Sequence, residues 1–320
     1  MNSGLRRLAL VASAIALGGT AATSAPCSNP NALGVSRVLT VDARAMPLIG
    51  SHDYGVTLPL APGEIVLTFD DGPLAPYTNA VLKALADECL RAVFFMVGRQ
   101  ARANPELAGQ VRAAGHTIGT HTQNHPLFRM PADRAAYEID TGIASVGSVF
   151  GTQRALAPFF RFPGLFRTVE GEHHLRLRGL MAWSVDADSY DWKRISSGHM
   201  MAHTLAEIEK RRGGILLMHD VQPKTALMLP ALLAELKARG YRIVHVMPKG
   251  SDPAADLVAS VAAPHRADHA APPPIDTEPR AARHHPSAAA RADVPPPRAH
   301  PGGNGLFEAI FTASGHRWGR

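Results

Sequence analysis

Short apolar runs alternate with amphipathic segments between residues 64 and 246. Seven of these runs are rich in β-branched and aromatic residues and have the length of buried strands. They are residues 64–69, 92–98, 116–121, 159–164, 180–186, 214–220 and 241–247. The helical segments between them, several of which end near a glycine, are residues 78–88, 105–114, 131–149, 197–212 and 225–239. This alternation predicts an α/β fold whose parallel strands are covered by helices, and both a barrel and an open sheet satisfy it.

The chain begins with the pattern of a secretory signal peptide. Arg6 and Arg7 precede a short apolar run, and small residues follow it up to Ala25. The run is shorter than the roughly 18 apolar residues that a membrane anchor needs. We therefore predict that residues 1–25 are removed on export to the periplasm or the extracellular space, which leaves no stable membrane anchor.

A change of composition after residue 248 divides the chain. Residues 251–320 hold 11 of the 26 prolines and six of the 16 histidines but no lysine, so this part cannot bury enough apolar surface to fold. We predict a Pro/Ala/His-rich, disordered tail over residues 249–320 and a catalytic domain over residues 63–248. Residues 26–62 are expected to form an N-terminal segment that packs on that domain.

Charge and cysteine content narrow the choice of partners. The 33 lysines and arginines outnumber the 27 acids and give a net charge of +6. These basic residues are scattered rather than clustered with aromatic residues, so nucleic-acid binding is not expected. We expect a monomer. The two cysteines, Cys27 and Cys89, would enter an oxidising compartment after export, where such a pair is typical of a disulfide.

Polar residues gather where the predicted strands end, which is where parallel α/β folds place their chemistry. The first strand ends in Asp70 and Asp71, two adjacent acids that repel one another when ionised and so predict a positive partner. The third strand runs into the segment "HTQNH", the fourth contains Arg161, the fifth is followed by the segment "DADSYDW", and the sixth ends in His219 and Asp220. Five such ends that converge would form one site.

The segment "HTQNH" places His121 and His125 four residues apart, so that on a helical turn both imidazoles face one side and can share a cation. The pair alone is more typical of core or surface histidines. It is not the HExxH motif of zinc proteases, because no glutamate follows the first histidine. With Asp71 as a third ligand, the set leaves a coordination position for water, as in catalytic zinc sites, and Asp70 would lie close enough to take a proton from that water.

Five segments, in this order, resemble the motifs of the polysaccharide deacetylase family, also called carbohydrate esterase family 4 or the NodB homology domain. They are "TFDDGP", "HTQNH", "RFPG", "DADSYDW" and "LLMH". The resemblance covers about residues 63 to 248 and implies a distorted (β/α) barrel with about seven parallel strands. It also implies hydrolysis of the N-acetyl group of amino sugars in a peptidoglycan-like or chitin-like glycan, with release of acetate.

The resemblance assigns a role to each residue that matches a motif. Asp70 would be the catalytic base, oriented by Arg161, and His219 the general acid, held by Asp191. The ligands of a divalent metal, usually zinc, would be Asp71, His121 and His125. The walls of the pocket for the acetyl methyl group would be Trp192 and Leu217.

One motif departs from the family pattern. Many members have a tyrosine whose backbone N–H is thought to bind the oxyanion, where this chain has Gly164. A backbone donor survives this change, but an aromatic wall is lost, so the substrate choice can differ. Arg161 could be a surface ion-pair partner, but it lies inside an apolar strand, where an unpaired guanidinium would be costly. Without the other motifs, Trp192 and His219 could be ordinary core residues.

Three other functions remain open from the sequence. An amide hydrolase of the same fold could act on a non-sugar substrate. A phosphotransferase with an aspartyl nucleophile also has acids after an apolar strand, but it needs the spacing D-x-D. A catalytically inactive glycan-binding module would lack part of the base, acid and ligand set, whereas all candidates are present here. The sequence therefore favours an exported, metal-dependent deacetylase whose partner is an N-acetylated glycan.

Overall fold

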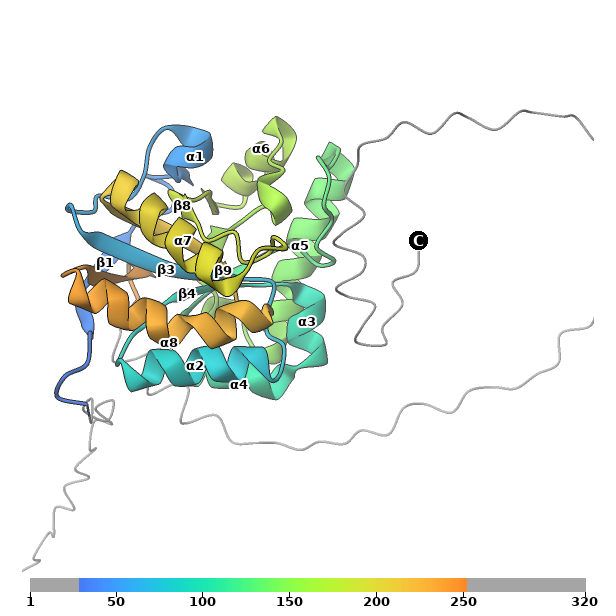
Figure 1. Ribbon diagram of the computed structural model, residues 1–320. Coiled ribbons are helices and arrows are strands. Elements are labelled where there is room, and N and C mark those ends of the chain that lie inside the picture. The colour runs from blue at the N-terminus through green and yellow to red at the C-terminus, as the bar shows by residue number, and fades with distance from the viewer. Residues whose placement is uncertain (1–28, 252–320) are drawn as a thin grey trace, which may run out of the picture. The chain divides into compact units, whose positions relative to one another are not determined.

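The computed structural model describes residues 29–251, which form a parallel sheet with helices packed on it (Figure 1). The strands are β1 (Val35–Val41), β2 (Leu48–Ile49), β3 (Glu64–Asp70), β4 (Val93–Met96), β5 (Thr117–Thr120), β6 (Phe159–Phe160), β7 (Met181–Trp183), β8 (Ala187–Asp188), β9 (Gly213–His219) and β10 (Arg242–Pro248). The helices are α1 (Ser51–Tyr54), α2 (Tyr77–Asp87), α3 (Gly98–Ala103), α4 (Pro105–Ala113), α5 (Ala132–Val149), α6 (Val169–Leu177), α7 (Ser197–Arg211) and α8 (Pro223–Ala238). Two 3-10 turns cover Gln153–Ala155 and Pro163–Leu165.

The strand order is β1-β10-β3-β4-β5-β6-β7-β2, and β9 pairs with both β3 and β8. Along one edge of β3, β9 pairs over the whole length, from Glu64 opposite Gly213 to Asp70 opposite His219. The other edge of β3 is shared, because β10 pairs with its first two residues and β4 with its last three. All these pairings are parallel, and among the described strands none joins β8 to β2 or β7. The predicted parallel α/β architecture is confirmed, and its hydrogen-bonded ladder stays open on one side.

Strand β3 is central because both of its faces are buried. Ile65, Leu67 and Phe69 lie in the core cluster that also contains residues of α2, α4, α5, α7 and α8. Val66 lies in a second cluster, formed with other strand residues on the opposite face of the sheet. Since side chains alternate along a strand, Asp70 emerges on the face of Val66, away from the helices. The carboxyl ends of the neighbouring strands can therefore surround it.

All seven predicted strands are present, as β3 to β7, β9 and β10, but three further strands were missed. Strands β1 and β2 come from the N-terminal segment and pair with β10 and β7, and the two-residue β8 pairs with β9. The signal peptide, Cys27 and nearly all of the tail lie outside the described residues, so those predictions and the domain boundaries stay predictions. Within residues 29–251 no helix combines the length and the apolar character needed to cross a membrane.

Candidate active site

Two buried acids end the central strand. Asp70 is the last residue of β3, and Asp71 follows it with a φ of 79°, a left-handed value that is uncommon for a residue other than glycine. Gly72 then donates its N–H to Asp220 Oδ1 at 3.1 Å, and a Cβ at this position would lie 2.1 Å from the other carboxylate oxygen. This tight turn keeps both Asp70 and Asp71 inside the protein, where an unpartnered carboxylate is costly.

The two histidines lie on a loop, so the helical turn predicted from their spacing is wrong. His121 directly follows β5, and the chain then turns through Thr122 and His125, with φ values of 64° and 56°. The Thr122 hydroxyl donates to the carbonyl of His121 at 2.5 Å and accepts the N–H of His125 at 3.0 Å. This compact loop brings the two imidazole rings to 5.1 Å between centroids, as the shared-cation hypothesis requires.

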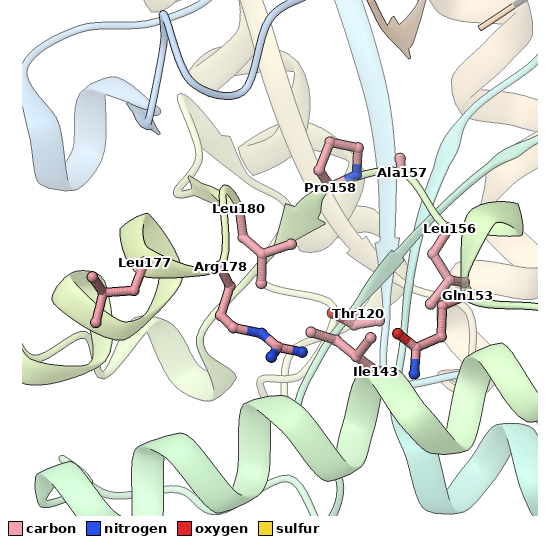
Figure 2. A pocket seen from close by; sticks show the side chains of 9 residues that line it. All are labelled: Thr120, Ile143, Gln153, Leu156, Ala157, Pro158, Leu177, Arg178 and Leu180. Atoms are coloured by element: carbon pink, nitrogen blue, oxygen red, sulfur yellow. The ribbon is translucent and has the colours of Figure 1, made fainter.

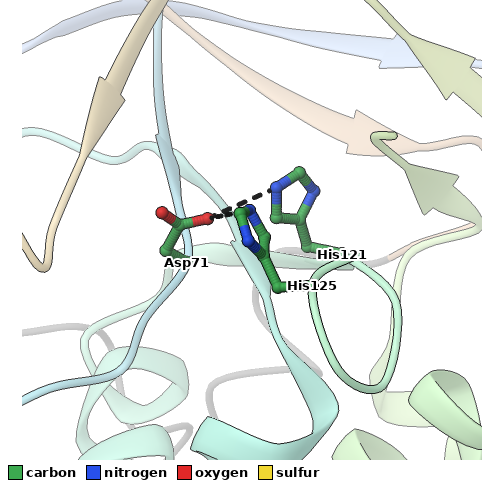
Figure 3. Close-up of side chains that lie close together, drawn as sticks. All are labelled: Asp71, His121 and His125. Atoms are coloured by element: carbon green, nitrogen blue, oxygen red, sulfur yellow. Dashed lines mark ion pairs between the residues drawn. The ribbon is translucent and has the colours of Figure 1, made fainter. Parts of the chain in front are cut away.

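Asp71 faces both imidazoles (Figure 3). Its Oδ1 lies 3.4 Å from Nε2 of His121 and 2.9 Å from Nε2 of His125. One ligand atom from each of the three residues lies within 4.8 Å of the others. Within the described part of the chain, Asp71 Oδ1 is buried and has no hydrogen-bond partner. An orphaned carboxylate oxygen beside two imidazole nitrogens fits a divalent cation.

The protonation of this cluster also suits a cation. His121 donates its Nδ1–H to the backbone carbonyl of Arg161 at 2.7 Å, which leaves Nε2 free of a proton when the ring is neutral. Burial by itself raises the pKa of the Asp71 carboxyl, but His125 and His121 outweigh it and hold that pKa well below its ordinary value. The direction of this shift favours the carboxylate form of Asp71, and a bound cation would take the place of the imidazole protons beside it.

Arg161 is the positive partner of Asp70. Its Nη1 donates to Asp70 Oδ1 at 2.7 Å and to the Thr68 hydroxyl at 2.9 Å, and its Nη2 donates to the carbonyl of Ser184 at 3.2 Å. The guanidinium is fully buried and lies over the Phe95 ring, 4.3 Å from its centroid. Arg161 directly follows β6, so the prediction that it lies inside this strand is wrong. Its burial and contacts exclude a surface ion-pair role.

His219 and Asp191 form a second buried pair. His219 donates Nδ1–H to Asp191 Oδ1 at 2.7 Å and its backbone N–H to Oδ2 at 2.7 Å. Burial alone lowers the pKa of His219, but the charge and hydrogen bond of Asp191 outweigh it and raise that pKa well above its ordinary value. Asp71 and Asp70 raise it further. His219 also lies opposite Asp70 in the β3–β9 register, so the His219–Asp191 pair is at the same end of the sheet as the Asp71 cluster.

Known proteins resemble this chain over the same region. The profile of the polysaccharide deacetylase family matches residues 58–180. A peptidoglycan-N-acetylglucosamine deacetylase of Bacillus cereus is 33% identical over 192 residues, which are 57% of this chain and 85% of that protein. The chain belongs to the polysaccharide deacetylase family.

Two further relatives show how far the similarity extends. The peptidoglycan-N-acetylglucosamine deacetylase PgdA of Listeria monocytogenes is 31% identical over 188 residues, which are 57% of this chain but only 38% of that protein. The solved structure of the peptidoglycan deacetylase Bd3279 of Bdellovibrio bacteriovorus is 32% identical, with a TM-score of 0.60 over 71% of this chain and 62% of that one. The polysaccharide deacetylase fold therefore accounts for most of the described residues.

The expected walls of the acetyl pocket, Trp192 and Leu217, both lie next to Asp188 of β8. Trp192 donates its indole N–H to Asp188 Oδ2 at 3.2 Å, and Leu217 is paired with Asp188 in the β8–β9 register. Gly164, in the third motif of the polysaccharide deacetylase family, has a φ of 57°. Among the described residues, no hydrogen bond or ion pair joins Gly164 to the Asp71 cluster. Its contribution to an oxyanion site stays a prediction.

Several residues that support the site were not singled out from the sequence. Thr225 donates to Asp191 Oδ2 at 2.5 Å. Asp220 accepts from Thr78 at 2.6 Å, and burial, followed by the charge of Asp71, raises its pKa to about 7. Glu138 is fully buried on α5 and contacts the histidine loop. The only signal for Glu138 was an acid at an apolar-face position of an amphipathic helix, beside Ile139.

A separate cavity of about 400 Å³ lies next to α5 and the end of α6 (Figure 2). Its lining residues are Thr120, Ile143, Gln153, Leu156, Ala157, Pro158, Leu177, Arg178 and Leu180. None of these is a predicted catalytic or metal-binding residue of the deacetylase, and Arg178 is already paired with Asp140 at 3.3 Å. The candidate active site is therefore distinct from this cavity.

Proposed function

We propose that the protein is an exported, metal-dependent N-deacetylase that removes acetyl groups from the amino sugars of a cell-wall glycan and releases acetate. The observation that carries the proposal is the Asp71–His121–His125 cluster, next to the Arg161-bound Asp70, which pairs with His219 in the β3–β9 register. The names of three relatives favour N-acetylglucosamine in peptidoglycan as the substrate.

Zinc is the cation that we propose for this cluster, because two imidazoles and one carboxylate are a common ligand set of catalytic zinc. When bound, it would polarise the acetamide carbonyl and make a nearby water more acidic. Asp71, His121 and His125 would hold the ion.

Asp70 is the proposed base. Its Oδ1 is engaged by Arg161 at 2.7 Å, whereas its Oδ2 lies 3.8 Å from His121 Nε2 and so faces the ligand cluster. In the proposed reaction Asp70 Oδ2 accepts a proton from the water whose oxygen attacks the acetamide carbon. Arg161 stabilises the ionised carboxylate and fixes its orientation, since the guanidinium itself has four engaged or packed neighbours and cannot swing away.

His219 is the proposed acid. Its Nδ1–H is committed to Asp191, so the proton on Nε2 is the one available for transfer. As the carbon–nitrogen bond of the tetrahedral intermediate breaks, His219 gives this proton to the leaving amine. The acetyl group leaves as acetate and the sugar keeps a free amine. We further propose the Gly164 backbone N–H as an oxyanion donor, with Trp192 and Leu217 as walls around the acetyl methyl group.

Acetate release tests the proposal. The purified full chain is incubated with peptidoglycan, chitin oligosaccharides and an N-acetylated peptide, with and without a chelator and with zinc added back. We expect acetate from peptidoglycan, its loss with the chelator and its recovery with zinc. Release from the peptide alone would favour an amide hydrolase of the same fold. Glycan binding without acetate from any substrate would instead identify an inactive binding module, and either result overturns the proposal.

A further inference from the structure

The loop of residues 121–125 carries two of the three proposed metal ligands but belongs to no helix or strand. Residues 121 and 122 are buried and residues 123–125 are half-buried, so the peptide groups of the loop need hydrogen-bond partners outside it or from its own side chains. On one side the partners come from the start of α3. The N–H of Gly98 donates to the carbonyl of Thr122 at 2.9 Å, and the N–H of Arg99 donates to the carbonyl of Gln123 at 3.0 Å.

On the other side the partner is Glu138 of α5. The backbone N–H groups of Gln123 and Asn124 both donate to Glu138 Oε2, at 3.0 and 2.7 Å. The side-chain amide of Asn124 donates to Oε1 at 3.0 Å. Only the N–H of His125 uses a partner within the loop, the Thr122 hydroxyl. Glu138 thus holds two of the three residues that separate the proposed ligands, Gln123 and Asn124.

The burial of Glu138 makes these bonds significant. Its side chain is fully buried, and Arg134, on the preceding turn of the helix, lies 2.6 Å from Oε1. A buried carboxylate is costly unless it is paired and hydrogen-bonded, and charge-assisted bonds to backbone N–H groups are stronger than neutral ones. Removing the carboxylate would leave two loop N–H groups without their acceptor.

Gly142 lies one helical turn after Glu138 and faces the same loop. A Cβ on Gly142 would lie 2.6 Å from the carbonyl carbon of Thr122 and 2.8 Å from its oxygen. Real Cβ atoms do not approach backbone so closely, so any larger residue would push the loop or the helix aside. The glycine allows α5 to lie directly against the residue that follows His121.

We propose that α5 sets the geometry of the metal site, with Glu138 and Gly142 as positioning residues for the loop that carries His121 and His125. The inference rests on the proposed function only in that these histidines bind a metal. Groups that orient metal ligands typically change metal affinity by about 10- to 100-fold when removed. Loss of Glu138 or of the small residue at 142 should therefore weaken metal binding although every ligand remains.

The zinc affinity of the purified full chain tests this proposal, measured by competition with a chromophoric chelator. We expect Glu138→Ala to weaken zinc binding by about 10- to 100-fold. Glu138→Gln should lose less, because one amide oxygen can still accept the loop N–H groups. The visible spectrum of cobalt(II) in the same site should change as well, since it reports ligand geometry rather than stability.

Glu64→Ala is the matched control for the glutamate. Glu64 is also a buried carboxylate that accepts a backbone N–H, from Ala61 at 2.8 Å, and pairs with an arginine, Arg37, at 2.7 Å. It lies at the start of β3, at the opposite end of the strand from Asp70. We expect Glu64→Ala to lower the free energy of unfolding while zinc affinity and the cobalt spectrum stay as in the wild type.

A second pair of variants tests the steric part. Gly142→Ala should weaken zinc binding, whereas Gly109→Ala, in the middle of α4, should not, because a Cβ at residue 109 meets nothing within 4 Å. If the wild type binds no zinc, the proposed function and this inference both fail. If the wild type binds zinc and folded Glu138→Gln and Gly142→Ala bind it equally well, only the inference about α5 is overturned.

Discussion

Each proposed acid–base residue has one side-chain atom committed to a buried partner and another left for chemistry. Asp70 gives Oδ1 to Arg161, and His219 gives Nδ1 to Asp191. The hydrogen-bonded atom fixes the orientation of the side chain. The other atom, Asp70 Oδ2 or His219 Nε2, is left for proton transfer. Substitutions that keep the shape of these side chains but change their charge can therefore separate chemistry from folding.

Asp70→Asn should keep the metal and lose activity. The amide keeps an oxygen for the bond to Arg161, and Asp71 with the two histidines remains, so zinc bound per chain should stay at the wild-type level. A positioned base contributes about 10²- to 10⁴-fold, so kcat should fall by at least about 10². Acetate release under saturating substrate, with metal content measured on the same sample, checks this. Near-normal turnover would show that the base lies elsewhere.

Asp191→Asn should shift the pH dependence of the reaction. His219 must be protonated to act as the acid, so activity falls as pH rises through its pKa. Asp191 raises that pKa, and removing its charge should lower it, which moves the alkaline limb of kcat/KM to lower pH. Asp87→Asn, at an exposed position on α2, should leave the limb in place. An unmoved limb in Asp191→Asn would argue against His219 as the acid.

Motif chemistry made most site residues predictable, because a metal site and an acid–base pair restrict the residue types that can serve. The loop conformation was not predictable in the same way. A spacing of four residues suggests a helix, but Thr122 and His125 adopt left-handed φ values, stabilised by the Thr122 hydroxyl and by contacts with α3 and α5. Glu138 was missed because its role depends on the tertiary contact between α5 and that loop.

Strands with long apolar runs were predictable, and short or half-exposed ones were not. Strand β1 alternates between half-buried and exposed positions and has no continuous apolar run. Strands β2 and β8 have only two residues each, so their identity depends on the neighbours with which they pair. Local sequence carries no information on such tertiary pairing.

One junction between strands contains two buried histidines. Strand β10 pairs with β3 only as far as Ile243, and β4 takes the same edge from Thr68 onward. Beyond the branch point, His245 of β10 bonds Thr117 of β5 through Nε2 at 2.9 Å. The Thr117 hydroxyl donates its own proton to Val246 at 2.7 Å, so His245 is the donor in this pair. His116, next to Thr117, accepts the N–H of Ala92 on Nδ1, so that nitrogen carries no proton.

These histidines should make the fold sensitive to acid. Burial, followed by the charge of Arg91, lowers the pKa of His245 to about 4, whereas an unfolded chain protonates histidine near 6.5. The unfolded state therefore binds more protons below about pH 6.5, and stability falls as pH drops toward 4. His245→Gln keeps a neutral donor, so its loss of stability between pH 7 and 5 should be smaller than the wild type's by about 2 kcal/mol.

Urea unfolding of chelator-treated protein at the two pH values measures this difference. His199→Gln, at an exposed position on α7, is the control and should lose as much stability as the wild type does. Equal losses in His245→Gln and the wild type would show that His245 is not the acid-sensitive group.

At the scale of the whole molecule, the first described residues are held against the end of α2. The Asn29 side chain donates to the carbonyl of Asp87 at 2.9 Å, and the N–H groups of Leu33 and Gly34 donate to Glu88, at 2.6 and 2.9 Å. Cys89 follows directly and is not a free thiol. The predicted partner, Cys27, lies outside the described residues, but it is only two positions before Asn29.

The protein should therefore contain one disulfide, between Cys27 and Cys89. Mass analysis of alkylated protein under non-reducing conditions should find no modified cysteine, and reduction should expose two. Closing a loop of this size typically stabilises a fold by about 2–4 kcal/mol, so reduced protein should unfold at lower urea concentration. Two alkylatable thiols in the non-reduced protein would contradict the pairing.

Arg161 joins both halves of the reaction machinery. Its guanidinium donates a hydrogen bond to the carboxylate of Asp70 on β3. Its backbone carbonyl accepts a hydrogen bond from Nδ1–H of His121, which follows β5. One residue, Arg161, therefore sets the position of the proposed base relative to a proposed metal ligand. A displacement of residue 161 would break or strain its bonds to both groups. A change in the position of Arg161 would therefore alter the orientation of Asp70 and of His121 at the same time.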